Sequence, residues 1–329
     1  MKKKVHIRSE NITDYARIAE INALAFAGYN QPPLESTYRP EVTLVDGLRH
    51  GANFDPELSL VAQVDGNVVG HVLFYPFEIT IAGEALRALS LAPIAVHPAF
   101  QKMGIGTRLI EEGHRRGVQK GYSFAFLLGH PSYYPRFGYR TEMFGEGWLE
   151  IGREDIPSLE TDLQERLVQP EDIETLVKWW KYWFEDVDLA LFPGSTLMDW
   201  ITHSAGIMST VVTRNGEMVG YLRYAKGKPG EPKLFLARDR SAVNALLAYL
   251  NEKDQRSQEK RFRLPLHPYS GAVKDCLDLP FESHLRTWEA AMIKILDEEC
   301  REVREYCDQV KLGERSPGLL IYPPSVEFA

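Results

Sequence analysis

The sequence of 329 residues contains few cysteines, and their spacing does not suit a shared role. Cys276, Cys300 and Cys307 are the only three, and no two of them form a CxxC pair. An odd number of thiols without a pairing pattern favours a reducing compartment, so we expect a cytoplasmic protein. No group of His, Cys, Asp and Glu has zinc-ligand spacing, and we therefore expect no metal site.

Long apolar runs and long basic runs are also missing. No stretch of 18 apolar residues occurs, and the basic start Met1-Lys-Lys-Lys leads into polar residues instead of the apolar core of a signal peptide. The formal net charge is −8, from 38 Lys and Arg against 46 Asp and Glu. This acidic balance disfavours nucleic acid and anionic membranes as partners.

The most informative feature that is present is a glycine-rich turn between a strand pattern and a helix pattern. Residues 94–107 read Ile-Ala-Val-His-Pro-Ala-Phe-Gln-Lys-Met-Gly-Ile-Gly-Thr, which places Gln101, Gly104 and Gly106 in the spacing Q-x-x-G-x-G. The start of a helix offers free backbone N–H groups, and glycines let a bulky anion approach them. The turn therefore predicts a phosphate or pyrophosphate site.

The spacing of this turn excludes two other phosphate-binding motifs. A dinucleotide-binding fingerprint would need a third glycine where Leu109 stands, and no P-loop sequence occurs in the chain. With Val96-x-Pro98 before it, the segment resembles the Q/R-x-x-G-x-G/A signature of the GNAT superfamily of acyl-CoA-dependent N-acyltransferases. The expected ligand is therefore acetyl-CoA, or CoA itself.

The hydrophobic pattern of the first half predicts a mixed fold of the α+β class. We expect a helix over residues 12–27, hairpins around Asp65-Gly66 and Ala82-Gly83, and separate strands over 78–81, 86–89 and 90–96. A helix from the glycine turn to Lys120 and strands over 123–128 and near 148–151 follow. The result is a largely antiparallel sheet flanked by helices, and the GNAT fold has this order.

The second half repeats parts of the first, which predicts a duplicated, tandem arrangement. The run from Asp65 to Gly70 has a counterpart from Asn215 to Gly220, and residues 171–184 match the first helix. We expect a catalytic GNAT domain over residues 1–155 and a degenerate GNAT-like domain over 156–329. The second copy has no glycine between Gly230 and Gly271, so it is expected to close a substrate cleft or to form a subunit contact. Its region 297–310 is predicted to be an exposed, charged helix.

The resemblance implies which residues hold the cofactor. The backbone of Ile94 and Val96 would pair with the pantetheine arm, and the amides from Lys102 to Thr107 would hold the pyrophosphate. The full predicted cofactor-binding set is Ile94, Ala95, Val96, Gln101, Lys102, Met103, Gly104, Ile105, Gly106 and Thr107.

The catalytic residues are assigned by the chemistry that amide formation needs. Tyr134-Pro-Arg-Phe-Gly138-Tyr139 is similar to the family's Tyr-x-x-x-Gly-Phe, so Tyr134 is the predicted general acid for the leaving thiolate, with Tyr133 as its alternative. Aromatic packing alone is the other interpretation of both tyrosines. Glu78 and His130 are the candidate general bases, and a water molecule held by backbone carbonyls would serve as well.

These assignments predict an acyl-CoA-dependent N-acyltransferase. It would transfer the acetyl group of acetyl-CoA to the primary amine of a small molecule or a peptide, by direct attack of the amine on the thioester. The alternative is a non-catalytic acyl-CoA-binding or sensor protein with an interaction domain. The resemblance also implies that the protein could form a homodimer, which is common in the family.

Overall fold

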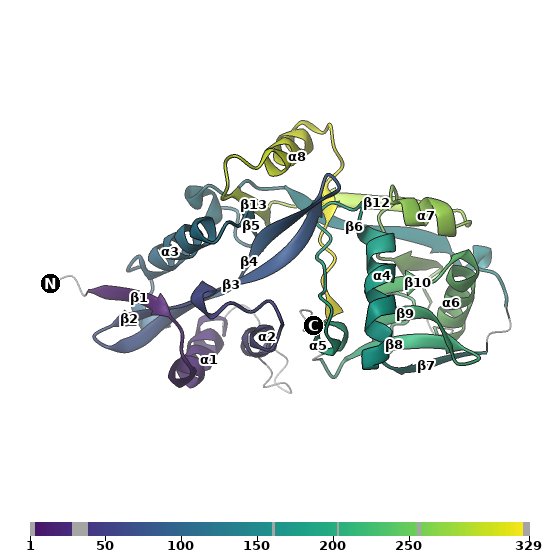
Figure 1. Cartoon of the computed structure of the whole chain (residues 1–329), viewed down its shortest axis with the longest axis horizontal. Helices are drawn as coiled ribbons and strands as arrows, with labels where there is room; N and C mark the ends of the chain where they lie inside the picture. The colour runs from purple at the N-terminus through teal and green to yellow at the C-terminus, as the bar shows by residue number, and fades with distance from the viewer. Residues whose placement is uncertain (1–3, 28–38, 160–161, 203, 255–257, 325–329) are drawn as a thin grey trace.

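The computed structural model describes residues 4–27, 39–159, 162–202, 204–254 and 258–324, and in it two sheet-and-helix halves lie side by side (Figure 1). The first half is built on a six-stranded sheet in the order β1-β2-β3-β4-β5-β13. All neighbouring strands run antiparallel except β4 and β5, which run parallel. The strands are β1 (Val5–Ser9), β2 (Ser59–Val64), β3 (Asn67–Ile81), β4 (Glu84–Val96), β5 (Phe124–Leu128) and β13 (Ala291–Ile295).

Helices cover both faces of this sheet because its strands bury apolar side chains on both. Ile18 and Ile21 of α1 (Tyr15–Ala25) and Val45 of α2 (Pro40–Arg49) form one buried cluster with strand residues. On the other face, Leu109 of α3 (Ile105–Gln119) packs in a cluster with Phe74. The short 3-10 turns are η1 (Ile12–Asp14), η2 (Pro56–Leu58), η3 (Pro98–Phe100), η4 (Tyr134–Phe137), η5 (Arg153–Asp155) and η6 (Pro170–Asp172).

The predicted fold class is confirmed, whereas the strand boundaries needed correction. The separate strands expected at 78–81 and 86–96 are the ends of two long strands, β3 and β4, which pair from Gly70–Val96 to Ile81–Glu84. Pro76 does not break β3, because β2 begins opposite Leu73 and at Pro76 itself β3 pairs with β4 alone among the described strands. The helix α2 was not predicted from the sequence.

The second half repeats the beginning of the first in the same order. The order of its four-stranded antiparallel sheet is β10-β9-β8-β7. In chain order, one helix follows the first strand, β7, and another follows the fourth strand, β10. Both halves open with the same ion pair: Arg8 binds the two Asp14 oxygens at 2.6 and 2.8 Å, and Arg166 binds those of Asp172 at the same two distances. The elements are β7 (Leu163–Leu167), α4 (Ile173–Phe184), α5 (Leu197–Trp200), β8 (Ile207–Arg214), β9 (Glu217–Ala225), β10 (Leu234–Ala237) and α6 (Arg240–Lys253). The likeness supports a duplication, and the boundary between residues 155 and 156 stays a prediction.

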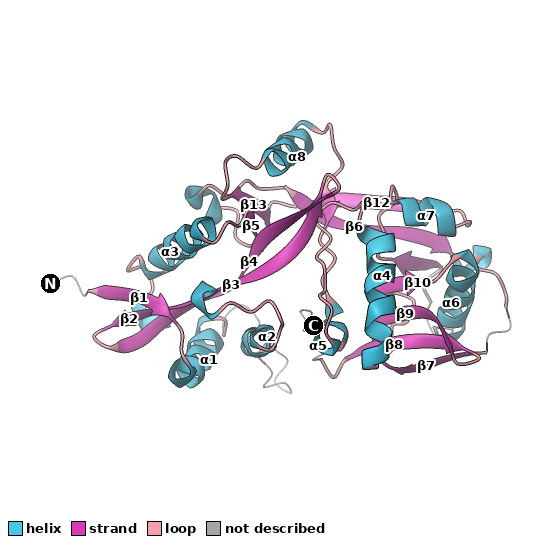
Figure 2. Cartoon of the chain, in the orientation of Figure 1, coloured by secondary structure: helices cyan, strands magenta, loops and turns pink. Residues whose placement is uncertain are grey.

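The two halves exchange strands. In the third sheet β6, from the first half of the chain, lies between β11 and β12 from the second half, while β13 from the second half pairs with β5 in the first sheet. Figure 2 shows β6 and β12 running together toward the helices of the second half. The remaining elements are β6 (Phe144–Gly152), β11 (Arg261–Leu264), α7 (Gly271–Cys276), β12 (Glu282–Thr287), α8 (Arg301–Leu312) and β14 (Gly318–Leu319), which pairs with β6.

A connecting segment further ties the halves together. The backbone N–H of Leu189 donates to Thr80 and that of Phe192 to Glu78, both at 2.9 Å, so this segment extends the outer edge of β3. Arg315 holds the segment by pairing with both oxygens of Asp188, at 2.6 and 3.0 Å.

The C-terminal helix α8 differs from its prediction. The charged residues of region 297–310 led us to expect an exposed helix, but α8 buries Val303, Tyr306 and Cys307 against the first sheet. An amphipathic helix has one apolar stripe, which a high overall charge conceals. Among the helices that the structure describes, none is long and apolar enough to cross a membrane.

Candidate active site

A wedge opens between the two parallel strands of the first sheet. β4 and β5 pair only from Ala88–Phe124 to Ser90–Phe126, and beyond these positions the two strands have no residue pairs. β4 also carries one extra residue between the positions that pair with Val72 and Phe74, which is a β-bulge. Backbone polar groups of β4 beyond the bulge thus lack a strand partner on the β5 side. A ligand with amide groups can pair with them there.

The glycine turn connects the end of β4 to α3. Gly104 is the N-cap of α3 and has φ 77°, a left-handed conformation that favours glycine. No side chain caps this helix start, and its first turn has no acidic residue. The residues from Gln101 to Gly104 are exposed. The first turn of α3 therefore presents free N–H groups and the positive end of the helix dipole to an anion.

Gly106 brings the helix start close to a tyrosine. A Cβ at this position would lie 2.9 Å from Oη of Tyr133 and 3.9 Å from side-chain atoms of Ile94 and Val96. The structure thus brings the start of α3, the end of β4 and the tyrosine loop together. Any larger residue at position 106 would crowd this junction.

The side chains of two other predicted cofactor residues have structural contacts. The Gln101 amide donates to the backbone oxygen of Val96 at 3.1 Å, which holds the turn against the end of β4. Ala95 is buried in the cluster beneath α1. For these two residues only the backbone remains for a ligand, while Lys102 and Met103 stay exposed.

Tyr134 lies at the end of β5, beside the wedge. A Cβ on Gly129 would come within 2.3 Å of the Tyr134 ring, so the ring packs directly on the backbone that follows β5. Its ring contacts Tyr133 and Tyr139 edge to face, with centroids 5.1 and 5.8 Å apart. Burial and the neighbouring Tyr133 raise the pKa of Tyr134 to about 12. The phenol thus stays protonated at neutral pH.

The two candidate bases lie in different places. His130 is exposed and belongs to the same loop as Tyr134, where its backbone oxygen accepts from the N–H of Tyr133 at 3.0 Å. Glu78 is exposed on β3 opposite Arg87, which precedes the stretch where β4 and β5 pair. The wedge opens after that stretch. His130 and Tyr134 therefore lie in one loop at the open end of the β4–β5 pairing, and Glu78 lies near its other end.

Comparisons with known proteins identify the family. Residues 6–141 match the family described as "Acetyltransferase (GNAT) domain". An uncharacterized N-acetyltransferase of Escherichia coli K12, YjhQ, is 36% identical over 137 residues, which are 41% of this chain and 71% of the relative. The chain belongs to the GNAT acetyltransferase family.

The fold of the whole chain also has GNAT counterparts among solved structures. A GCN5-related N-acetyltransferase from Kribbella flavida covers 90% of this chain and 72% of its own length, with a TM-score of 0.63 at 15% identity. This likeness shows the fold alone. A GNAT family acetyltransferase from Brucella melitensis, solved in complex with acetyl-CoA, is 37% identical over 42% of this chain and 84% of its own, with a TM-score of 0.36.

The second half of this GNAT chain has no counterpart of the glycine turn that starts α3. Only residues 238 and 239 separate β10 from α6, whereas residues 97–104 separate β4 from α3. The carboxylate of Asp239 accepts from the backbone N–H of Ala242 and so caps α6. A negative charge at the helix start repels a second anion. The absence of the glycines and the Asp239 cap thus both argue against a phosphate site at the start of α6.

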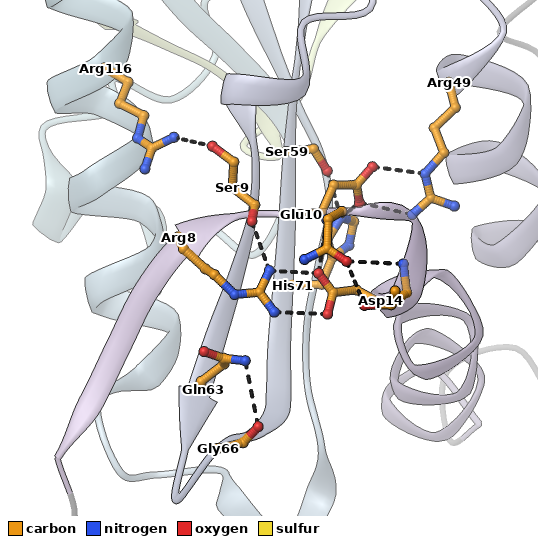
Figure 3. A network of polar contacts seen from close by, with 12 residues as sticks. Arg8, Ser9, Glu10, Asp14, Arg49, Ser59, Gln63, Gly66, His71 and Arg116 are labelled. Carbon is orange, nitrogen blue, oxygen red and sulfur yellow. Dashed lines mark hydrogen bonds and ion pairs between the residues drawn. The ribbon is translucent and has the colours of Figure 1, made fainter.

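A buried polar network beneath α1 and α2 was not predicted from the sequence. His71 is fully buried on β3, with Nε2 3.0 Å from Ser59 Oγ and 3.5 Å from Glu10 Oε2 (Figure 3). Arg49 of α2 donates to both Glu10 oxygens, at 2.8 and 2.9 Å. Burial raises the pKa of Glu10, but the bonds to His71 and Arg49 outweigh it and lower the pKa to about 2. Burial lowers the pKa of His71.

The network holds the helices that cover one face of the sheet. It links the end of β1 to α2 through an ionised carboxylate, next to the ion pair of Arg8 and Asp14 at the start of α1 (Figure 3). No spacing in the sequence signals it, because Glu10, Arg49 and His71 lie on three separate elements.

One group outside the wedge has ligand atoms close enough for a metal. Glu150, Glu282 and His284 place one such atom each within 4.8 Å of one another on β6 and β12. Arg263 and Arg261 bind the two carboxylates, at 3.1 and 2.6 Å. These two cations already neutralise the carboxylates, so the group resembles a surface ion-pair network.

Proposed function

We propose that this GNAT protein is an N-acetyltransferase that uses acetyl-CoA as acyl donor and a primary amine as acceptor. The observation that carries the proposal is the uncapped, glycine-bounded start of α3 at the mouth of the wedge between β4 and β5. A pyrophosphate suits the free N–H groups of this helix start. The pantetheine arm, which has amide groups, suits the unpaired edge of β4.

In this proposal the amine attacks the thioester carbonyl directly. The new C–N bond forms as the C–S bond breaks, the electron pair of that bond stays on sulfur, and a proton leaves the amine. Tyr134 protonates the departing thiolate, which is supported by its place beside the wedge and by its phenol being protonated at neutral pH. Backbone N–H groups near the bulge of β4, where Ile94 lies, would stabilise the oxyanion.

We infer that His130 is a better candidate than Glu78 for the proton acceptor. His130 shares a loop with Tyr134, whereas Glu78 lies at the opposite end of the paired stretch. A water molecule held by backbone carbonyls is the alternative to His130. Residues 1–155 carry all these groups, so we propose that they form the catalytic half and that residues 156–329 bound the acceptor side.

The first experiment measures cofactor binding. Isothermal titration of the full chain with acetyl-CoA and with CoA should give saturable binding at or below millimolar concentration. Acetyl-pantetheine, which lacks the phosphates, is the matched control and should bind far more weakly. Absence of binding by acetyl-CoA and CoA would contradict the cofactor assignment.

The second experiment separates an enzyme from a sensor. A panel of primary amines, including polyamines, amino sugars and peptide N-termini, is screened for release of free CoA thiol. The enzyme predicts amine-dependent thiol release with at least one acceptor. A protein that binds acetyl-CoA but releases no thiol across the panel would favour the non-catalytic acyl-CoA-binding alternative.

A further inference from the structure

One arginine outside the glycine motif reaches the start of α3. Arg136 lies in η4, and its Nη2 donates to Oγ1 of Thr107, in the first turn of α3, at 3.3 Å. The guanidinium carbon lies 4.0 Å from the ring centroid of Tyr133 and 4.8 Å from that of Phe137. Stacking on two rings holds a planar guanidinium in a fixed orientation.

Arg136 brings a positive charge to the start of α3. Within the part of the chain that the structure describes, no carboxylate forms an ion pair with Arg136. By contrast, Arg115 and Arg116 on α3 both pair with Glu112, at 2.6 and 2.8 Å. Arg136 is exposed, so its cation is open to a ligand at the first turn of α3.

Tyr133 places a hydroxyl at the same spot. Its Oη would lie 2.9 Å from a Cβ on Gly106, so the phenol rests on the backbone of the first turn of α3. The two adjacent tyrosines therefore face different surroundings: Tyr134 packs on Gly129 at the end of β5, and Tyr133 lies over the helix start.

We propose that Arg136 and Tyr133 form a clamp that binds a phosphate group of CoA across the start of α3. The inference rests on the proposed function and adds two residues to the cofactor site. A guanidinium forms two charge-assisted hydrogen bonds with a phosphate, and the Tyr133 hydroxyl can donate a third. The phosphate is either part of the pyrophosphate or the 3′-phosphate of the ribose, and the two sources are separable by experiment.

The test compares Arg136→Gln with the unaltered chain by titration with CoA and with dephospho-CoA, which lacks the 3′-phosphate. We expect the substitution to weaken CoA binding roughly tenfold or more, the usual effect of losing hydrogen bonds to a charged group. A loss with CoA but not with dephospho-CoA assigns the 3′-phosphate, and a loss with both assigns the pyrophosphate. In turnover assays the KM for acetyl-CoA should rise while kcat holds.

Three controls make the outcome decisive. Arg115→Gln removes an exposed, paired arginine from α3 and should leave CoA binding unchanged. Arg136→Lys keeps the positive charge but loses the planar guanidinium with its paired N–H donors. Its CoA affinity should lie between those of the unaltered chain and Arg136→Gln. Tyr133→Phe should weaken CoA binding while its thermal unfolding stays like that of the unaltered chain.

Two different failures can be told apart. If the unaltered chain binds CoA and Arg136→Gln binds it equally well, the clamp is wrong and the proposed function stands. If the unaltered chain does not bind CoA at all, the proposed function fails and the clamp fails with it.

Discussion

At the scale of single residues, neighbouring side chains with the same chemistry differ by what surrounds them. Tyr133 and Tyr134 are adjacent in the sequence, yet one ring lies against the start of α3 and the other against the end of β5. Burial raises the pKa of Tyr134 to about 12. Its position is what makes it the candidate acid.

We predict that Tyr134→Phe lowers kcat by roughly 10²-fold or more, the usual contribution of a general acid, with little change in the KM for acetyl-CoA. An acid must be protonated to act, and the pKa of Tyr134 is about 12. Deprotonation of this phenol should therefore not lower kcat up to about pH 10. Steady-state kinetics with an acceptor whose chemistry limits the rate provide the check. Full activity of the variant would remove Tyr134 from the mechanism.

The buried carboxylate of Glu10 predicts a pH dependence of stability. Its pKa falls from 4.5 to about 2 on folding, so the ionised form stabilises the fold above pH 4.5, and this stabilisation is lost as the pH falls toward 2. The shift corresponds to about 3 kcal/mol of unfolding free energy. Glu10→Gln should lose about that much at pH 7 and show a smaller decline between pH 5 and pH 2.

Chemical unfolding of both proteins across this pH range measures the effect. Glu20→Gln is the matched control, because Glu20 is an exposed partner of Arg17 and its removal should leave stability within about 0.5 kcal/mol. Equal pH profiles for Glu10→Gln and the unaltered chain would exclude this role of Glu10.

At the scale of elements, the backbone of α3 approaches the sheet closely at two glycines, in addition to the packing of its apolar side chains. A Cβ on Gly113 would lie only 1.9 Å from the ring of Phe74, whereas one on Gly117 would meet a terminal methyl group of Leu89 at 2.8 Å. Glycine costs helix stability at both positions. It is kept at Gly113 because the helix backbone lies directly on an aromatic ring.

We therefore predict that the same substitution costs different amounts of stability at two positions in this helix. Gly113→Ala should destabilise the protein by about 1–3 kcal/mol, since an aromatic ring on a central strand has little room to yield. Gly117→Ala should cost less, because the leucine can move and alanine favours the helix by about 1 kcal/mol. Thermal unfolding of both variants measures the difference, and a larger loss for Gly117→Ala would contradict the argument.

At the scale of the whole molecule, the exchange of strands makes the halves depend on each other. β5 obtains its outer neighbour, β13, from residues 291–295, and β6 has its partners in the second half. A fragment of residues 1–155 would expose the edge of β5 that faces away from β4, together with an unpaired β6. Exposed strand edges of this kind promote aggregation.

We predict that residues 1–155 expressed alone aggregate or bind CoA at least tenfold more weakly than the full chain. Expression together with residues 156–329 should restore a one-to-one complex with full affinity. Sedimentation and CoA titration check both statements. A fragment 1–155 that is monomeric and binds CoA normally would show that the exchange is dispensable.

The sequence was a good guide to local structure and to the cofactor motif, and a poor guide to whatever depends on distant partners. The glycine turn, the hairpin at Asp65-Gly66 and the helices at 15–25 and 173–184 were predictable because their signals are local. The buried face of α8 and the network of Glu10 and His71 were not, because their partners lie on other elements.

By itself the sequence determined that one half carries the glycine turn and the other does not, because glycine spacing acts through a few consecutive residues. The tertiary structure decided which segments lie near the wedge between β4 and β5. It placed His130 and Tyr134 together, set Glu78 apart, and brought Arg136 to the start of α3. It also decided that the sheets exchange strands, since register and strand order depend on pairing between segments far apart in the chain.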